Sequence, residues 1–335
     1  METLLLNENQ LDIAAELIIK GEVVGIPTET VYGLGADASN ENAVRKIFSA
    51  KGRPADNPLI VHLADFSEAV RYTSYIPELA NKLAEKFCPG ALTMVMPKND
   101  RIPSVTSGGL DTVGIRVPSH PVMHRIIEIS GKPIAAPSAN ISGYPSPTSA
   151  QHVVRDMKGR ISAVVDGGQS EYGVESTVIS FENENTVRIL RPGCITEKML
   201  LTVCENVIID KAVLSGLAKD EKAASPGMKY KHYSPQADII MIESNLDGFI
   251  KYVGEHYGDG VYSLIFDGDE KNFPYRHMTY GADSLQQAQQ IFRKLRELDD
   301  VNATKVYVRS PEKDGVGLAV YNRLIRAAGF EVIRL

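Results

Sequence analysis

The chain has 335 residues, of which 43% are hydrophobic and 23% are charged. This length exceeds the usual size of a single domain, and the composition excludes an intrinsically disordered chain. The formal net charge of -6 excludes a surface that attracts polyanions as a whole, so phosphate chemistry would have to depend on local basic clusters. The cysteines Cys88, Cys194 and Cys204 have no CxxC spacing, which argues against a zinc site and a disulfide framework.

The first 21 residues lack a basic region and a cleavage site of small residues. No later stretch approaches the roughly 18 consecutive apolar residues that a membrane-spanning helix requires. We therefore expect a soluble, cytoplasmic protein.

The first two thirds of the chain predict many strands with a few helices between them. In chain order we expect a helix Gln10 to Lys20, a strand Val23 to Pro27, a helix Asn40 to Lys51 capped by Ser39 or Asn40, a strand Leu59 to Leu63, a helix Pro77 to Phe87, strands Ala91 to Met96 and Val113 to Val117, a helix opening at Ser119, strands Ile134 to Ala136, Ala163 to Val165, Thr177 to Phe181 and Val187 to Leu190, and a helix Glu197 to Cys204. Numerous strands at mixed spacing predict one large α/β domain with a twisted mixed sheet.

A polar segment with prolines, Lys219 to Pro235, has no apolar period and predicts an interdomain linker. After it, strands and helices alternate: strand Asp238 to Ile242, helix Leu246 to His256, strand Val261 to Phe266, helix Ser284 to Leu298, strand Lys305 to Val308, helix Val316 to Ala328 and strand Glu331 to Ile333. This rhythm predicts a small Rossmann-like α/β domain with a mainly parallel sheet. The expected boundaries are 1–215, 216–236 for the linker and 237–335.

Several common signatures are missing from the sequence, including GxxxxGK[ST], a strand-linked GxGxxG, HExxH and GxSxG. A protein that uses ATP would therefore have to hold phosphate by other means.

Polar and glycine-rich motifs follow the ends of the predicted strands. The first, Pro27 to Gly35, carries Thr30 and could approach a small polar ligand, or it could be a turn in which Gly33 and Gly35 adopt positive φ. The second contains Lys51 and Arg53, which could clamp a triphosphate, although Lys51 could simply complement a helix C-terminus. His62 on the apolar strand that follows is more typical of a hydrogen-bonded core residue.

Arg116 lies in an apolar strand, and a buried guanidinium needs either an internal acidic partner or a bound carboxylate. Farther on, Ser138 and Asn140 alternate and could face one ligand, or Asn140 or Ser142 could cap a helix. Two weaker motifs are Val174 to Thr177 and Arg191 to Gly193. Hydroxyls, amides and cations without a nucleophile and its base favour a site that orients two substrates and stabilises phosphoryl charge.

Five ordered motifs, PTETVYGLG, KGRP followed by NPLIVH, VGIRVP, APSAN and HYSP, resemble those of the YrdC family. The chain is similar in particular to the longer threonylcarbamoyl-AMP synthases, which carry an extra C-terminal domain. The resemblance to the family core covers about residues 5–205, and the linker with the small domain extends it to the whole chain.

The resemblance implies a positively lined cavity that binds L-threonine and ATP, with Mg²⁺ accompanying the nucleotide and no metal ligands assigned to side chains. The implied contacts of L-threonine are Thr30, His62, Arg116 and Ser176, with Arg116 facing the carboxylate. The implied contacts of ATP are Lys51, Arg53, Asn57, Thr112, Ala136, Ser138, Asn140, Ser146, Arg191 and Tyr233. Lys51 and Arg53 are the residues to which catalysis is assigned.

The implied reaction is attack of the threonine amine on bicarbonate or carbon dioxide, followed by attack of the carbamate on the α-phosphorus with pyrophosphate leaving. Threonylcarbamoyl-AMP would then pass to the machinery that forms N6-threonylcarbamoyladenosine in tRNAs reading codons that begin with A. Excluding water would protect the short-lived carbamate, and the Lys51 and Arg53 pair with Mg²⁺ would offset charge on pyrophosphate.

Two other functions are compatible with the motifs. One is a non-catalytic RNA-binding module of the same fold, against which the acidic balance counts. The other is a carbamoyl-adenylate former that uses carbamoyl phosphate, against which the missing acylphosphatase and zinc-finger segments count. Whichever function holds, residues 225–235 combine tyrosines, lysines and a histidine between prolines, and this composition predicts a lid over the nucleotide. The alternative is that Tyr230 and Tyr233 only dock the linker on the first domain.

Overall fold

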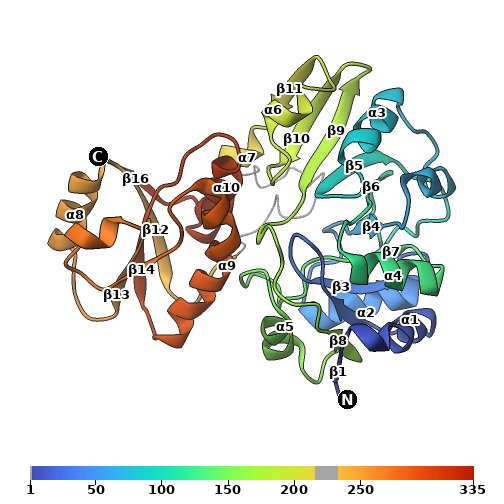
Figure 1. Cartoon of the computed structure of the whole chain (residues 1–335), viewed down its shortest axis with the longest axis horizontal. Helices are drawn as coiled ribbons and strands as arrows, with labels where there is room; N and C mark the ends of the chain where they lie inside the picture. The colour runs from blue at the N-terminus through green and yellow to red at the C-terminus, as the bar shows by residue number, and fades with distance from the viewer. Residues whose placement is uncertain (1, 216–232) are drawn as a thin grey trace.

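The computed structural model describes residues 2–215 and 233–335. Two sheets organise these residues: a mixed sheet of 11 strands in the order β1-β8-β2-β3-β7-β4-β6-β5-β9-β10-β11, and a 5-stranded sheet in the order β14-β13-β15-β12-β16. Every pairing in the second sheet is parallel. The predicted fold class, a mixed α/β domain followed by a small domain with a parallel sheet, is confirmed (Figure 1).

The first sheet draws its strands from residues 4–209. Its strands are β1 (Leu4–Leu6), β2 (Val24–Ile26), β3 (Gly33–Asp37), β4 (Ile60–His62), β5 (Leu92–Pro97), β6 (Thr112–Arg116), β7 (Ile134–Ala135), β8 (Ala163–Val165), β9 (Thr177–Asn183), β10 (Thr186–Arg191) and β11 (Asn206–Ile209). The accompanying helices are α1 (Leu11–Ile19), α2 (Glu41–Lys51), α3 (Glu78–Phe87), α4 (Pro121–Ser130), α5 (Ala150–Met157), α6 (Glu197–Leu200) and α7 (Ala212–Ser215), with 3-10 turns at Glu8–Gln10 and Phe66–Arg71.

The second sheet contains β12 (Asp238–Glu243), β13 (Val261–Ile265), β14 (His277–Thr279), β15 (Lys305–Arg309) and β16 (Val332–Arg334). Its helices are α8 (Leu246–Glu255), α9 (Ser284–Asp300) and α10 (Gly317–Ala327), with a 3-10 turn at Asp269–Asn272. In Figure 1, α9 and α10 lie on the side of this domain that faces the first domain, and α8 lies on the far side. No helix within the described ranges combines the length and the apolar character needed to cross a bilayer.

Helix α2 shows how local sequence sets the elements that carry the site. Asn40 is its N-cap, because the Asn40 side chain accepts hydrogen bonds from the backbone N–H groups of Asn42 and Ala43. Gly52 ends the helix in the left-handed conformation, at φ 63°. Val44 and Ile47 are fully buried on one face, so the helix is fixed against the sheet and its last turn is placed beside the loop after β7.

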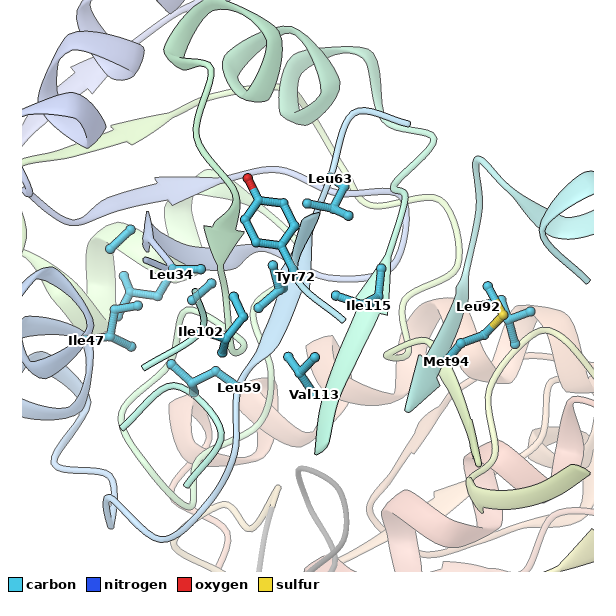
Figure 2. Packing of buried hydrophobic residues seen from close by; sticks show 14 of the residues in the cluster. Leu34, Ile47, Leu59, Leu63, Tyr72, Leu92, Met94, Ile102, Val113 and Ile115 are labelled. Atoms are coloured by element: carbon cyan, nitrogen blue, oxygen red, sulfur yellow. The ribbon is translucent and has the colours of Figure 1, made fainter. Parts of the chain in front are cut away.

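The main core lies between the sheet and its helices. Figure 2 shows Leu34, Ile47, Leu59, Ile102 and Ile115 among the apolar side chains that interlock there. Burial of such side chains is worth roughly 1.5 to 3 kcal/mol each relative to exposure, which makes this cluster the main source of stability of the first domain. The strands around the site are therefore packed on a continuous apolar core.

One of the two alternatives left open for the first motif, a turn with glycines at positive φ, is not what the structure has. Gly33 and Gly35 do not adopt positive φ in a turn; they belong to β3, which pairs antiparallel with β2. Close packing explains the glycines, because an added Cβ at Gly35 would lie 2.6 Å from Ile26 Cδ1 and one at Gly33 would lie 3.1 Å from Ala136 Cβ. Glycine lets β3 pass close to the loop that follows β7.

The two domains are joined through buried polar contacts. Arg296 on α9 pairs with Asp156 on α5 at 2.7 Å, and Arg323 on α10 pairs with Glu175 at 2.8 Å. At Gly173 the domains meet backbone to backbone, since an added Cβ would lie 2.4 Å from Ala288 O and 2.5 Å from Gln289 Cα. The second domain is thus packed directly against the segment that leads into β9.

Candidate active site

A cavity lies where several strands and loops of the first sheet end. The residues that line it are Thr28, Thr30, Val31, Gly33, Arg53, Ile60, His62, Arg116, Ala136, Pro137, Ser138, Glu175, Ser176, Arg191 and Tyr233. They come from β4, from the ends of β2, β6, β7 and β10, from the first residue of β3, from the segment after α2, from the residues before β9, and from the beginning of the second described range. Strand ends are the usual place for ligand sites in α/β sheets.

All four predicted threonine contacts, Thr30, His62, Arg116 and Ser176, line this cavity. His62 and Arg116 are partners in register on the parallel strands β4 and β6. Thr93 on β5 pairs in register with Arg116, and the hydroxyls of Thr93 and Ser176 lie 2.8 Å apart. Neighbouring strands therefore place a guanidinium, an imidazole and a hydroxyl side by side.

Arg116 has an internal acidic partner. Its Nη2 lies 2.8 Å from Glu29 Oε1, its Nε donates to Gly90 O at 3.3 Å, and no described residue accepts from its Nη1. Burial alone would raise the pKa of Glu29, but Arg116 and the N–H of Ser119 lower that pKa below its ordinary value. The salt bridge that the sequence left as an alternative is thus present, and Arg116 still reaches the cavity.

His62 is buried and neutral. Burial, together with the charge of Arg116, lowers its pKa to about 3. Its Nδ1 lies 3.2 Å from Ile134 O, and because a carbonyl only accepts, Nδ1 carries the proton. Nε2 is then a lone-pair acceptor, suited to a ligand hydroxyl or ammonium.

Ser176 and Arg191 form a second polar pair in the cavity wall. Arg191 Nε donates to Ser176 O at 3.1 Å and its Nη2 donates to Ser176 Oγ at 3.2 Å. Burial lowers the pKa of Arg191 to about 10, so the group stays a cation at neutral pH. With Arg53 and Arg116, it makes the described lining strongly cationic.

Tyr233 connects the cavity to the second domain. Its ring packs against Phe292 of α9 with the ring centroids 5.1 Å apart, and its backbone has φ 66°. Tyr233 belongs to an apolar cluster that combines Val31 and Val174 of the first domain with the core of the second. Tyr233 thus packs with residues of both domains.

Five predicted ATP contacts lie outside the cavity lining: Lys51, Asn57, Thr112, Asn140 and Ser146. Lys51 is buried, and its Nζ donates to Ser138 O and, at 2.6 Å, to Asn140 O. Burial, with a smaller effect of Arg53, lowers the pKa of Lys51 well below its usual value. In the structure Lys51 therefore binds the backbone of the loop after β7 and does not line the cavity.

Asn140 does not share a face with Ser138, although the sequence pattern suggested that it could. Ser138 lines the cavity, whereas Asn140 Nδ2 donates to Ile141 O and Tyr144 O within its own loop. A strand's alternation does not continue here because β7 ends at Ala135. Asn140 also caps no helix, since Ser149 caps α5.

Asn57, Thr112 and Ser146 occupy separate surroundings. The carbonyl of Asn57 lies 3.4 Å from Arg53 Nη2, so this residue supports the Arg53 side chain. Thr112 lines a small separate cavity under β5 and β6. Ser146 donates its hydroxyl to Glu175 Oε1.

Sequence reasoning missed Glu175 as a lining residue and gave Thr28 no role. Thr28 Oγ1 donates to Val31 O at 2.6 Å and accepts from the N–H of Thr30, which shapes the loop after β2. This ST-turn, in which a threonine hydroxyl accepts from a backbone N–H two residues later, could have been predicted from the sequence Thr28-Glu29-Thr30. The role of Glu175 had no local signal, because its partner Arg323 is 148 residues away.

The arrangement can hold anions and orient two ligands. Cationic groups, a neutral imidazole and hydroxyls converge, whereas the carboxylate in the lining, Glu175, is occupied by Ser146 and Arg323. Within the described ranges, no group of three or more His, Cys, Asp or Glu could hold a metal ion. A cationic pocket of this kind is suited to carboxylate and phosphate ligands.

Comparisons with known proteins find relatives for both parts of the chain. A family model described as "Telomere recombination" matches residues 16–193, and a model described as "Threonylcarbamoyl-AMP synthase, C-terminal domain" matches residues 195–329. A threonylcarbamoyl-AMP synthase of Pyrococcus abyssi is 44% identical, over 98% of this chain and 97% of the relative. One of Bacillus subtilis is 43% identical, over 98% of this chain and 95% of the relative.

The fold agrees equally well with a solved structure, that of P. abyssi Sua5 complexed with L-threonine. The TM-score is 0.91 at 41% identity, and the match covers 99% of this chain and 100% of the other. The agreement thus extends over both domains and over the strands that carry the cavity. The chain belongs to the threonylcarbamoyl-AMP synthase family.

Proposed function

We propose that this protein is an L-threonylcarbamoyladenylate synthase, which converts ATP, L-threonine and bicarbonate into threonylcarbamoyl-AMP and pyrophosphate. The observation that carries the proposal is the convergence in one cavity of the four predicted threonine contacts with Arg53, Ala136, Ser138, Arg191 and Tyr233. Relatives that match nearly the whole chain bear the name of this synthase, and one solved relative contains L-threonine.

In the proposed threonine site, Arg116 binds the carboxylate through its outer nitrogens. The Nε2 of His62 accepts from the amino acid, and Thr30 and Ser176 supply hydroxyls around it. Because Glu29 already neutralises part of the charge on Arg116, the threonine carboxylate meets a polarised pair rather than a bare cation. Such a pair holds the amino acid in one orientation, which places its amine for carbamate formation.

In the proposed ATP site, Arg53 and Arg191 face the phosphates, and Ala136, Ser138 and Tyr233 surround the nucleotide. Lys51 contributes by holding the loop that carries Ser138. The carbamate oxygen attacks the α-phosphorus, the bond to the bridging oxygen breaks, and pyrophosphate leaves. Fixed guanidinium groups stabilise the charge that develops on the leaving group.

Mg²⁺ is proposed to arrive with the nucleotide. The described residues offer no cluster of acidic metal ligands, but the amide oxygens of Asn57 and Asn140 are buried acceptors without a hydrogen-bond partner in those ranges. Amide and phosphate oxygens are the kind of hard ligand that Mg²⁺ takes. The bound ion would supply charge neutralisation to the phosphates.

The product is proposed to pass to the tRNA-modifying transferase that forms N6-threonylcarbamoyladenosine, and a cytoplasmic location suits that role. The proposed lid, residues 225–235, lies largely outside the described residues; of its tyrosines, Tyr230 is outside them and Tyr233 lines the cavity. The domain boundaries 1–215, 216–236 and 237–335 also stay proposals.

Pyrophosphate release tests the function directly. The purified chain is given ATP, Mg²⁺ and each of the twenty amino acids in turn, with and without bicarbonate. Release that requires both threonine and bicarbonate is the expected result. Salt-dependent RNA binding without such release would instead favour the non-catalytic RNA-binding module.

A further inference from the structure

Arg323 belongs to the second domain, yet it contacts the wall of the cavity. It lies on α10 with a side chain that is fully buried, and its Nε donates to Glu175 Oε2 at 2.8 Å. Glu175 lines the cavity beside Ser176 and Arg191. A charge from one domain is thus matched by a charge in the ligand site of the other.

The same guanidinium also fixes the backbone around the site. Arg323 Nη1 donates to Pro192 O at 2.8 Å, and Nη2 donates to Glu175 O at 3.3 Å. These carbonyls belong to the segments that carry Ser176 and Arg191. The two segments touch at Gly193, where an added Cβ would lie 2.4 Å from Thr177 N.

The ion pair between Arg323 and Glu175 sets the charge at this side of the cavity. Burial would raise the pKa of Glu175, but Arg323, Arg191 and Ser146 lower it, so the carboxylate is ionised at neutral pH. A full negative charge therefore borders a cavity proposed to bind ATP phosphates. Unless another cation balances it, this charge would repel the phosphates. It would also attract Arg191, the cation of the lining that acts on Glu175.

We propose that Arg323 is a positioning residue for ATP binding: it neutralises Glu175, so that Arg191 stays directed at the phosphates. The proposal rests on the ATP site proposed above. It gives the second domain a defined part in the site of the first. The charge balance at the threonine end rests on a different pair, because Arg116 has its own counter-ion in Glu29.

The test is a charge-rescue cycle in the full-length chain. Arg323→Met keeps most of the side-chain volume and removes the charge, Glu175→Gln removes the opposite charge, and the double variant removes both. Calorimetry measures the affinities for ATP with Mg²⁺ and for L-threonine separately. Arg323→Met is expected to weaken ATP binding at least about tenfold while changing threonine affinity much less, and the double variant is expected to regain most of the loss.

Arg155→Met serves as the control, because Arg155 forms an exposed interdomain salt bridge with Asp300 at 2.8 Å away from the cavity lining. It is expected to leave both affinities unchanged. A double variant that binds ATP no better than Arg323→Met overturns the proposal, and so does an equal loss of ATP and threonine affinity. The double variant removes both members of the Arg323–Glu175 pair, so neither is left as a lone charge, and it also provides a folded sample if Arg323→Met unfolds.

The readout separates this proposal from the proposed function. ATP affinity is measured without turnover, so a wild-type chain that binds ATP but releases no pyrophosphate contradicts the synthase function alone. A wild-type chain that releases pyrophosphate, with no rescue in the double variant, contradicts the role of Arg323 alone.

Discussion

Arg116 and Glu29 form a buried ion pair, with Nη2 and Oε1 2.8 Å apart, at the wall of the cavity. A pair of this kind in a ligand site has two tasks, because removing either partner leaves the other charge buried and alone. Its effect on binding must therefore be measured against its effect on folding.

Arg116→Ala is expected to weaken threonine binding strongly and to leave ATP binding nearly intact. Loss of a buried charge-assisted contact is worth on the order of 2 to 5 kcal/mol. The variant should also be less stable to urea, since Glu29 loses its counter-ion, and Arg116→Ala combined with Glu29→Gln should recover stability without recovering threonine affinity. Calorimetry that finds unchanged threonine affinity in the folded variant would remove Arg116 from the threonine site.

Arg53→Ala is expected to lower turnover more than it weakens threonine binding, because its proposed partner is the departing phosphate chain. Arg53 also donates to Pro58 O at 3.2 Å, so a modest loss of stability should accompany the change. The control is Arg45→Ala on α2, the helix that precedes Arg53, where Arg45 is exposed and pairs with Glu41. If only the melting temperature falls, with turnover per folded molecule preserved, Arg53 has a structural role.

His62 is expected to make folding stability depend on pH. Its pKa is about 3 in the folded chain against an ordinary 6.5, so between these values the unfolded chain binds a proton that the folded chain does not. The stability from neutral His62 is complete above pH 6.5 and is lost as the pH falls toward 3, with a limiting slope of about 1.4 kcal/mol per pH unit.

Urea unfolding at several pH values between 4 and 8 measures this slope. A His62→Gln variant should show a shallower decline below pH 6.5 than the wild type. Above pH 7.5 the imidazole is neutral in both states, so the two curves should run parallel there and provide an internal control. Equal slopes at low pH would show that His62 is protonated in the folded chain.

Tyr233→Ala is expected to impair ATP use without unfolding the protein. The ring lines the cavity and packs on Phe292, so its loss opens the site and loosens one contact with the second domain. Tyr257→Ala, at an exposed tyrosine of the second domain, is the matched control. Pyrophosphate release at limiting ATP measures the effect, and unchanged release in the Tyr233 variant would contradict a role in the nucleotide site.

Truncation before Ser225 extends the same test. The lid hypothesis predicts a folded first domain with poor synthesis, and it predicts that ATP protects residues 225–235 of the full chain from proteolysis. The cut would also leave Glu175 without Arg323 and expose Val31 and Val174. Full activity of the truncated chain would show that neither the lid nor the second domain is needed for the site to work.

Local patterns predicted the elements that are built from local forces. Helix α2 was expected from its apolar period and a cap at Ser39 or Asn40, and its observed bounds, Glu41–Lys51, agree closely. Strand β3 was not predicted because Gly33 and Gly35 are residues typical of a turn. The edge strand β1, Leu4–Leu6, was not predicted because its three residues show no alternation of apolar and polar side chains. Glycine required by packing cannot be distinguished from glycine required by φ without the neighbouring strand.

The site divided along the same line. Strand register places His62 and Arg116 side by side. Their assignment to the threonine site came from the family resemblance, because the residue pattern alone favoured a core role for His62 and left Arg116 open between an internal partner and a bound carboxylate. Residues in longer loops could not be placed in this way. The Asn140 side chain, for example, donates to Tyr144 O within its own loop. The role of Arg323 could not be predicted from the neighbouring sequence, because its contact with Glu175 exists only when α10 packs against the first domain.

Gly173 gives the border between the domains an unusual sensitivity. Because the backbone of α9 occupies the space where a side chain would begin, even one methyl group there would act as a wedge between the two halves of the chain. The positive φ of 74° adds a second obstacle to any replacement. A substitution at this position would push the two domains apart without changing any charged side chain named above. It would therefore separate the contribution of domain packing from the contribution of the charges of the second domain.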